Sequence, residues 1–425
     1  MFENFEQVEA FFVSRKSLGI KPGLDRVKAL LSLMNNPQDR MQAIHVAGTN
    51  GKGSTIHFLK DALKAGGYQV GVFTSPSMTG LTGHIMLNDS NIPEDTFLEL
   101  LRAIHPAIMQ LDRQSQSPTE FEIMTVLAFM YFSNHADIAL IEAGMGGRED
   151  TTNVFSPILS IITNVARDHT AFLGDTTAEI AYQKAGIIKK CTPVISGDMD
   201  KEALQVIEKE ARLHEVQHYQ LGKGFSYTNP EKKGISQKFS WHKDTDYSVS
   251  IAIQMQGEHQ IKNASIAYMA LMLLIDNGYV LDLKQAIKAM ENTQVPGRFE
   301  VIQRDPVIII DGAHNPAAIQ VFINTVEENY KDKERHLLFA AFKDKEIEKM
   351  LNNLSTHFSS ITLTSFDHPR AARADALYQT TKAVEKRICS DWEDAIKQMI
   401  QSKDRHYFIT GSLNFIAIVR NYFKQ

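Results

Sequence analysis

The fold of this 425-residue chain is decided by Ile44-His45-Val46-Ala47-Gly48-Thr49-Asn50-Gly51-Lys52-Gly53-Ser54-Thr55. Its apolar start predicts a buried strand, and its end predicts an amphipathic helix that runs from Ser54 to Ala65. Glycines let the backbone approach a phosphate and direct several N–H groups at it, and the following helix terminus adds a favourable dipole. Lys52 can neutralise outer phosphate oxygens, while a hydroxyl of Ser54 or Thr55 can coordinate magnesium. The stretch predicts a nucleoside-triphosphate site.

The loop departs from the common phosphate-binding pattern G-x-x-x-x-G-K-[ST]. Val46 stands in place of the first glycine, and an extra Gly53 follows the lysine. Short glycine motifs also serve as plain strand–turn–helix junctions, so the surrounding pattern matters. One strand is predicted at Gln42–Ala47 before the loop, and another at Tyr68–Phe73 after the helix. This βαβ context favours the phosphate site over a plain turn.

Composition and charge exclude several classes of protein. The net charge of −5, with lysines scattered along the chain, argues against a nucleic acid partner. Only Cys191 and Cys389 are present, so neither a disulfide framework nor a thiolate metal site is expected. The acidic N-terminus lacks a signal-peptide layout, and the longest apolar run, Ile266–Ile275, is too short to cross a bilayer. We therefore expect a cytoplasmic protein without a membrane partner.

The length predicts two or three domains, and the alternation of strand and helix patterns predicts parallel sheets flanked by helices. We expect an α/β protein with a P-loop, mostly parallel sheet domain at residues 1–295, which carries a small antiparallel insertion between Phe225 and Met255. A smaller C-terminal Rossmann-like α/β domain is expected at 296–425, after a linker at Gln294–Gly297. The other predicted elements are helices at 121–132, 258–276 and 282–292, and strands at 136–141, 158–163, 307–311, 337–341 and 407–412.

Three polar residues follow or neighbour the predicted inner strands. Glu142 ends the strand at 136–141, where open α/β sheets bind ligands, and a carboxylate there can hold magnesium. Without the neighbouring loop, a solvated carboxylate at a strand end would be the favoured interpretation. His169 follows the next strand at the same edge, but histidine is a less usual magnesium ligand than a hydrogen-bonding residue. Lys184 lies in a short helix, where most lysines are surface residues. Spacing alone assigns no role to His169 or Lys184.

The predicted C-terminal domain has its own polar cluster. Asp311-Gly312-Ala313-His314-Asn315-Pro316 follows an apolar strand, and this crowding of side chains indicates ligand contacts. An Asn-Pro step is also an ordinary turn or helix start, so both interpretations stay open. Arg298, just after the linker, is either a phosphate contact or a surface charge.

Taken together, these motifs resemble those of folylpolyglutamate synthases and dihydrofolate synthases, the folate branch of the Mur-ligase-like amide ligases. Each motif is weak alone, but their shared order over nearly the whole chain is specific. They are Gly48–Ser54, Thr74-Ser75-Pro76, Glu142 with its glycines, Asp150–Asn153, Asp168-His169, Lys184–Ile188, Asn263, Pro296–Arg298, Asp311–Pro316 and Thr410–Ser412.

The resemblance implies that ATP, a folate carboxylate and L-glutamate give an amide, ADP and phosphate. Polyglutamylation is the expected main activity, and dihydropteroate is a further candidate acceptor in the same site. Magnesium is the implied metal, with a monovalent cation as an additional candidate. The implied ATP contacts are Gly48, Thr49, Asn50, Gly51, Lys52, Gly53, Ser54, Asn263, Arg298, Asp311 and His314.

The resemblance also implies catalytic roles for Lys52, Glu142, His169 and Lys184. Ser54, Ser75 and Glu142 would hold one magnesium, and His169 a second. Lys184 matches a lysine that this family carbamylates, which would turn its cation into an anionic oxygen donor near a metal.

The folate end of the site is implied by two segments that resemble the family's pterin pocket, with Phe121 stacking on the ring. The residues expected to bind substrate are Asp25, Arg26, Thr119, Phe121 and Asp150. After Thr74-Ser75-Pro76 the family usually continues to Asn/Thr-Glu-Arg-Ile, whereas this chain has Thr82-Gly83-His84-Ile85. The departure opens the question of how this loop contacts substrate.

Two alternatives remain from the sequence. One is a Mur-type ligase that acts on a UDP-linked precursor, against which stand the extra Gly53 and the short segment before the phosphate loop. The other is a P-loop nucleotide-binding regulator without ligase activity, which gives no reason for Lys184 or for Asp311–Pro316. With no oligomerisation signal visible, a monomer is the default expectation.

Overall fold

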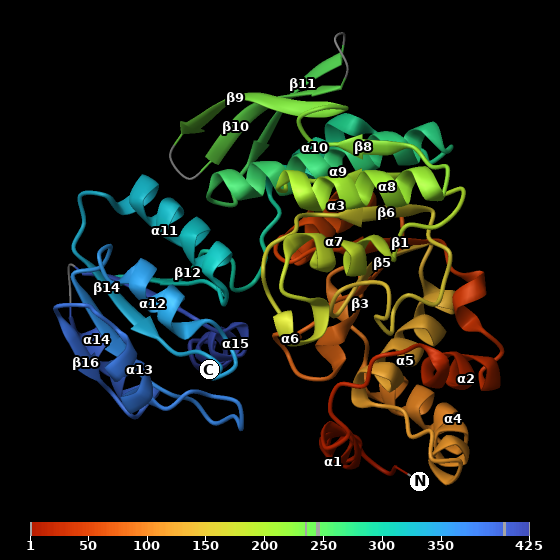
Figure 1. The fold of residues 1–425 in the computed structure, drawn as a ribbon, viewed down its shortest axis with the longest axis horizontal. Helices are drawn as coiled ribbons and strands as arrows, with labels where there is room; N and C mark the ends of the chain where they lie inside the picture. The colour runs from red at the N-terminus through yellow and green to blue at the C-terminus, as the bar shows by residue number, and fades with distance from the viewer. Residues whose placement is uncertain (1, 234–235, 244–246, 403–404, 425) are drawn as a thin grey trace. The chain divides into compact units, whose positions relative to one another are not determined.

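The computed structural model describes residues 2–233, 236–243, 247–402 and 405–424 and divides into two compact units (Figure 1). The first unit comprises Met1–Ile253 and Ile261–Thr293, and the second comprises Gln254–Gln260 and Gln294–Gln425.

The first unit is built on an eight-stranded sheet in the order β4-β3-β2-β5-β1-β6-β7-β8. The adjacent strands β2-β5-β1-β6-β7-β8 run parallel to one another, whereas β3 pairs antiparallel with both β2 and β4. Strand β1 lies between β5 and β6, so the loop that follows it emerges at the middle of the sheet. The strands are β1 (Ala43–Ala47), β2 (Val70–Phe73), β3 (Ile85–Leu87), β4 (Ser90–Asn91), β5 (Ile138–Glu142), β6 (Leu159–Ile162), β7 (Val194–Ser196) and β8 (His218–Gln220).

Two positions of β1, four residues apart and so on the same face of the strand, reach different helices. Ala43 lies in an apolar core with α1, α2, α4 and α5, and Ala47 lies in a second core with α7 and α8. Because side chains alternate along a strand, Ile44 and Val46 face the other side of the sheet. The helices are α1 (Phe5–Lys16), α2 (Asp25–Leu33), α3 (Lys52–Ala65), α4 (Glu94–Arg113), α5 (Glu120–His135), α6 (Thr170–Leu173), α7 (Thr177–Ala185), α8 (Lys201–Leu213), α9 (Glu258–Asp276) and α10 (Leu283–Glu291), with 3-10 turns η1 (Pro37–Arg40) and η2 (Thr82–His84).

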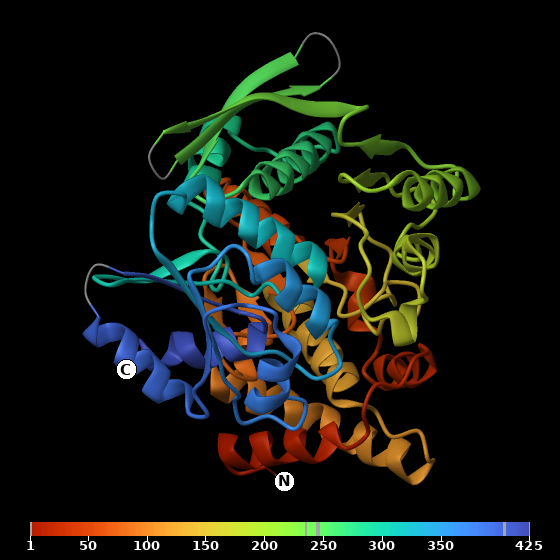
Figure 2. The ribbon, with the colours of Figure 1, turned by 60° about the vertical axis from the view of Figure 1, so that its left-hand side comes forward.

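The expected antiparallel insertion is a three-stranded sheet of β9 (Phe225–Lys233), β10 (Ser236–Lys243) and β11 (Tyr247–Ile253). It stands beside α9, as Figure 2 shows. The buried Trp241 of β10 donates from its indole nitrogen to the carbonyl oxygen of Ser265 in α9, at 3.2 Å, and packs against Tyr268. These contacts anchor the insertion on the helix that also carries Asn263.

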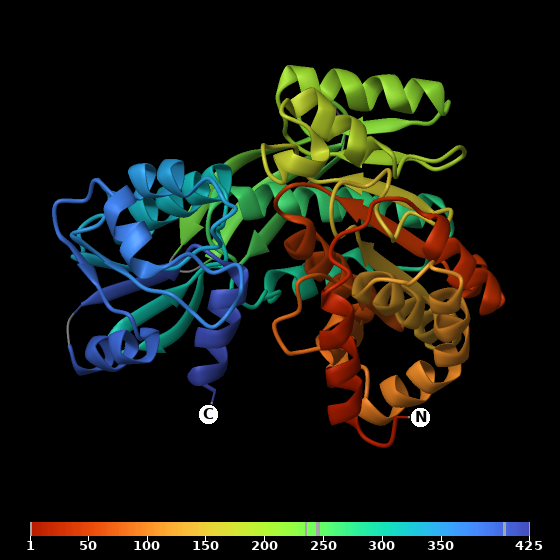
Figure 3. The ribbon, with the colours of Figure 1, turned by 60° about the horizontal axis from the view of Figure 1, so that its bottom comes forward.

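The second unit is built on a six-stranded sheet in the order β12-β13-β17-β14-β15-β16, with only β12 antiparallel. Its helices cover both faces of the sheet, as Figure 3 shows. The strands are β12 (Glu300–Arg304), β13 (Val307–Ile310), β14 (Arg335–Phe339), β15 (Ser360–Leu363), β16 (Lys386–Ile388) and β17 (His406–Thr410). The helices are α11 (Pro316–Tyr330), α12 (Ile347–Leu354), α13 (Ala374–Thr380), α14 (Trp392–Gln401) and α15 (Leu413–Tyr422).

The predicted fold class is confirmed, down to the insertion and the smaller C-terminal α/β unit. Helix α3 begins at Lys52, two residues before the predicted start at Ser54. The apolar pattern does not reveal this first turn because its residues are polar or glycine. In the part of the chain that the structure describes, no helix combines the length and hydropathy that crossing a membrane would need.

Candidate active site

The glycine loop joins β1 to α3 along a backbone path that excludes side chains. Gly51 precedes α3 in the left-handed region, with a φ of 83°, and a Cβ there would lie 2.4 Å from Oδ1 of Asn263. At Gly48 a Cβ would lie 1.9 Å from Oγ1 of Thr163. The loop therefore presents bare backbone at the N-terminus of a long helix, which is the arrangement that binds phosphate.

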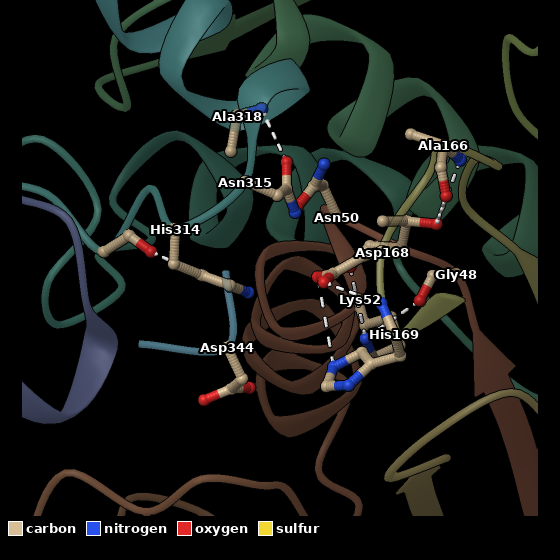
Figure 4. Close-up of polar contacts among 12 residues, drawn as sticks. Gly48, Asn50, Lys52, Ala166, Asp168, His169, His314, Asn315, Ala318 and Asp344 are labelled. Carbon is tan, nitrogen blue, oxygen red and sulfur yellow. Dashed lines mark hydrogen bonds and ion pairs between the residues drawn. The ribbon is translucent and has the colours of Figure 1, made fainter. Parts of the chain in front are cut away.

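A second loop, which follows β6, holds the glycine loop in place. The backbone N–H of Asn50 donates to the side-chain oxygen of Asn164 at 2.9 Å. The hydroxyl of Thr49 donates to the carbonyl oxygen of Ala166 and accepts from its N–H, both at 3.0 Å (Figure 4). The Thr163 hydroxyl donates to the Asn50 carbonyl oxygen at 2.6 Å. These bonds fix the loop before any ligand contributes.

Lys52, Glu142 and Ser75 come together from three segments. The Lys52 ammonium donates to the carbonyl oxygen of Gly48 at 2.9 Å and lies 3.7 Å from Oε1 of Glu142 (Figure 4). The other carboxylate oxygen of Glu142 accepts from the backbone N–H of Ser75 at 3.4 Å. Glu142 and Ser54 are both almost completely buried. The Lys52 ammonium thus lies beside a buried carboxylate that also accepts from the start of the loop after β2.

His169 lies beyond β6, at the start of α6, in a left-handed conformation with a φ of 51°. Its Nε2 is 3.9 Å from the buried carboxylate of Asp168, and its backbone N–H donates to the same carboxylate at 2.9 Å (Figure 4). The adjacent carboxylate therefore holds the backbone of His169 in this turn, on the same side of the sheet as Lys52.

Lys184 is buried on α7, with only 3% of its surface exposed. Burial, together with the positive charge of Lys52, lowers the pKa of its amine to about 7, although Asp168 and Asp150 oppose the shift. No carboxylate of the described residues lies within 4 Å of its ammonium nitrogen. At neutral pH a large fraction of Lys184 is therefore an uncharged amine.

The second unit places Asp311 and His314 at the carboxyl end of β13. The Asp311 carboxylate accepts from the backbone N–H of Phe299 at 2.9 Å and from that of Ala313 at 2.8 Å. Burial raises the pKa of Asp311, and the nearby Arg298 guanidinium opposes that shift. His314 Nδ1 lies 2.8 Å from the Gly312 carbonyl oxygen (Figure 4). Because a carbonyl only accepts, Nδ1 is a protonated nitrogen of the ring in this contact.

Comparison with known proteins identifies the family. The Mur ligase middle domain matches residues 46–271, and the Mur ligase glutamate ligase domain matches residues 297–413. The dihydrofolate synthase/folylpolyglutamate synthase of Bacillus subtilis is 35% identical over 431 aligned residues, which cover 100% of both chains. The chain belongs to the folylpolyglutamate synthase/dihydrofolate synthase family. It is thus an ATP-dependent ligase, and the family predicted from its motifs is confirmed.

Solved structures of this family agree with the fold. A Mycobacterium tuberculosis folylpolyglutamate synthase complexed with ADP and AMPPCP is 27% identical with a TM-score of 0.89, covering 99% of this chain and 98% of its own. An FPGS–AMPPCP–folate complex is 29% identical with a TM-score of 0.86, covering 99% of this chain and 100% of its own. The Mur-type alternative that acts on a UDP-linked precursor is not better supported by these comparisons.

The two segments that were expected to line a pterin pocket meet at Glu122, a residue of the second segment to which the sequence assigned no role of its own. Glu122 is 1% exposed; one of its carboxylate oxygens accepts from the Thr119 backbone N–H at 2.7 Å, and the other lies 3.0 Å from Arg26. Thr119 in turn caps α5 through the Glu122 N–H, so the two residues form a capping box. The Thr-x-x-Glu spacing could have revealed this box in the sequence. Asp25 lies in the first turn of α2, next to Arg26.

Phe121 and Asp150 flank the glycines that follow β5. The Phe121 ring packs 5.7 Å from that of Phe73, and a Cβ on Gly144 would lie 2.7 Å from it. The buried Asp150 carboxylate accepts from the backbone N–H of Met145 at 2.7 Å and from the hydroxyl of Thr152 at 2.5 Å. Both oxygens of Asp150 are thus hydrogen-bonded within the loop that follows β5.

The oxygen donors near the glycine loop fit magnesium. No three His, Cys, Asp or Glu side chains converge into a metal cage among the residues that the structure describes. Magnesium keeps several waters and takes few protein ligands when it accompanies phosphates, and it prefers oxygen. The buried carboxylate of Glu142, which contacts the backbone of the hydroxyl-bearing Ser75, is compatible with such a donor set.

Proposed function

We propose that this chain adds L-glutamate to the carboxylate of folates, and also to dihydropteroate, through an acyl phosphate. The observation that carries the proposal is the convergence of Lys52, Glu142 and Ser75 at a bare glycine loop, in a chain whose relatives bear these two activities over its full length.

The reaction needs activation because a carboxylate is a poor electrophile. A carboxylate oxygen of the substrate attacks the γ-phosphorus of ATP, the bond from that phosphorus to the β–γ bridging oxygen breaks, and ADP leaves. The glutamate amine then attacks the acyl carbon, the carbon–oxygen bond to phosphate breaks, and the nitrogen loses its proton. Lys52 and the loop N–H groups balance the charge that develops on the phosphates.

Residues of the first unit would hold the metal nucleotide. Ser54, Ser75 and Glu142 are proposed to bind one magnesium, and His169 a second. Magnesium bound there would act as a Lewis acid on phosphoryl oxygens. The further nucleotide contacts that we propose in this unit are Gly48, Thr49, Asn50, Gly51, Gly53 and Asn263. Arg298, Asp311 and His314 of the second unit are also proposed nucleotide contacts, as the resemblance implies.

Lys184 is proposed to carry a carbamate. Only an unprotonated amine adds to CO2, and the lowered pKa of Lys184 supplies that form near neutral pH. The product is an anionic oxygen donor in place of a cation, and it is suited to the surroundings of a metal ion.

Asp25, Arg26, Thr119 and Phe121 are proposed to form the pterin side of the acceptor pocket. The bond network around Glu122 supports this, because it fixes Arg26 and Thr119 relative to each other. For Asp150 the bonds to Met145 and Thr152 favour an indirect role, in which it shapes the loop that borders Phe121.

The experiment is product mass after incubation with ATP, magnesium and glutamate, comparing tetrahydrofolates with dihydropteroate. Glutamates added to the folates alone identify a polyglutamate synthase, and product from dihydropteroate as well identifies a bifunctional enzyme. Phosphate release with ATP alone, without product, would instead support the nucleotide-binding regulator. Lys52→Ala is the matched negative control, since it removes the phosphate-binding cation.

A further inference from the structure

The loop between β2 and β3, residues 74–84, contains the Thr82-Gly83-His84 departure, to which the proposed function assigns no role. It contains no aspartate, glutamate, lysine or arginine. The loop begins at the carboxyl end of β2 with Thr74 and Ser75, and it returns to the sheet through η2 and β3. Its own side chains therefore provide no carboxylate, ammonium or guanidinium group for an ion pair.

His84 joins the two ends of the loop, residues 74 and 84, to each other. The backbone N–H of Thr74 donates to the carbonyl oxygen of His84 at 3.2 Å. In the opposite sense, Nδ1 of His84 lies 2.8 Å from the carbonyl oxygen of Thr74. Since that carbonyl can only accept, Nδ1 is the protonated nitrogen of the ring. The two ends of the loop are thus joined by one backbone bond and one side-chain bond.

The bond from His84 falls on the peptide that leads to Ser75. The Thr74 carbonyl and the Ser75 N–H belong to one planar peptide unit and point to opposite sides of it. His84 holds the carbonyl side, while the N–H side donates to the Glu142 carboxylate at 3.4 Å. A turn of this plane would break both bonds together. His84 and Glu142 are therefore linked through a single rigid group.

Gly83 makes this arrangement possible. A Cβ at Gly83 would lie 2.1 Å from Oγ1 of Thr79 and 2.3 Å from Oγ of Ser77. The Thr79 hydroxyl accepts from the side-chain amide of Asn91 at 3.0 Å, and the Ser77 hydroxyl accepts from the Thr79 N–H at 3.1 Å. A larger residue at position 83 would require these hydroxyls to move and would disturb their bonds next to His84. Gly83 and His84 therefore act as a pair.

We propose that His84 is a positioning residue, which fixes the Thr74–Ser75 peptide and thereby holds Ser75 against Glu142 for the binding of a magnesium nucleotide. The inference rests on the proposed function for the assignment of Ser75 and Glu142 to the metal nucleotide. It explains the departure of this loop, because a neutral imidazole and a glycine keep the start of the loop in register with the carboxylate.

The test compares His84→Asn, His84→Gln and His84→Ala. The amide nitrogen of asparagine occupies about the place of Nδ1 and can donate to Thr74, whereas that of glutamine reaches the place of Nε2. Magnesium-dependent ADP binding is measured by calorimetry, alongside kcat, KM for ATP and KM for the acceptor. Asn91→Ala is the matched control, because it removes a bond at the far end of the same loop.

For His84→Ala and His84→Gln we expect the magnesium concentration for half-maximal ADP binding to rise roughly fivefold to tenfold, the factor that one hydrogen bond is typically worth. His84→Asn should stay within about twofold of the wild type, as should Asn91→Ala. A purely structural role would lower the melting temperature without this rescue and without a change in magnesium requirement.

An unchanged magnesium requirement in His84→Ala would overturn the inference, as would His84→Asn impaired as strongly as His84→Gln. If His84→Ala does not fold, the Asn and Gln pair still decides. A wild-type protein that binds magnesium ADP but makes no ligation product would refute the proposed function alone, since the calorimetric comparison still tests His84.

Discussion

The backbone N–H of Arg148 donates to the carbonyl oxygen of Gln183 at 2.6 Å, so the glycine-rich segment after β5 is fastened to the last turn of α7. A Cβ on the neighbouring Gly147 would lie 2.8 Å from the Lys184 carbonyl oxygen, which shows how closely the two segments approach. The segment that follows the Glu142 carboxylate and the helix that carries Lys184 are thereby held as one piece.

Arg148→Ala should lower kcat about tenfold and stability by about 2 kcal/mol, since charge-assisted hydrogen bonds are lost. Its guanidinium lies 3.9 Å over the Tyr182 ring and donates to Glu210 at 2.9 Å. Steady-state kinetics and thermal melting check this. Arg212→Ala, on the exposed side of α8, is the control and should change neither. An unchanged kcat with a reduced melting temperature would show that the side-chain contacts of Arg148 serve folding alone.

Lys184→Ala should lower kcat at least about 100-fold, the scale seen when a charged group that stabilises a transition state is removed. With 13C-labelled bicarbonate, the wild type should give a carbamate carbon signal by NMR, and Lys184→Ala should lack it. Because the pKa of the amine is about 7, the signal should grow as the pH rises through 7. Lys189→Ala, whose native amine donates to Gly186, is the matched control and should keep the signal. The same signal in Lys184→Ala would place the carbamate elsewhere.

Glu142→Gln should raise the magnesium requirement and lower kcat by about 100-fold, because the amide keeps the size of the side chain but removes its charge. The 3.7 Å contact with Lys52 also loses its ionic character. Calorimetry with magnesium ADP measures the magnesium requirement of binding separately from kcat. Glu202→Gln, an exposed change in α8, serves as the control. Wild-type magnesium dependence in Glu142→Gln would remove this carboxylate from the proposed metal site.

His45 should make stability depend on pH. Burial lowers the pKa of its imidazole to about 3, and the charge of Lys189 contributes in the same direction. In the unfolded chain histidine takes up a proton near pH 6.5, so the folded state loses stability as the pH falls from 6.5 towards 3, by at most about 1.4 kcal/mol per unit.

His45→Gln should flatten that part of the profile. Glutamine has no titration there, and its amide can still donate to the Thr152 hydroxyl, which His45 Nε2 contacts at 2.8 Å. Melting temperatures from pH 7 to pH 4 provide the measurement. Parallel profiles for the wild type and His45→Gln would contradict the shifted pKa.

Local sequence patterns were sufficient to predict the first βαβ unit and the family of this protein. The apolar run before Gly48, the glycines and the helical periodicity after Lys52 predict the βαβ unit, because strand, turn and helix preferences act between near neighbours in the chain. The order of the motifs then predicts the family. Glu142 was predicted at a strand end, and the strand β5 does end there.

Contacts between segments that are distant in the sequence determined the burial and the partners of the polar side chains. The burial of Lys184 and the meeting of Arg26 with Glu122 each depend on partners from other elements. The same holds for His84 and Thr74, which the sequence marks only as a departure. A sequence specifies which groups can donate, accept or carry charge. Only the packed chain determines which of them lose water and which partner each one meets, and these two factors set pKa values and side-chain orientation.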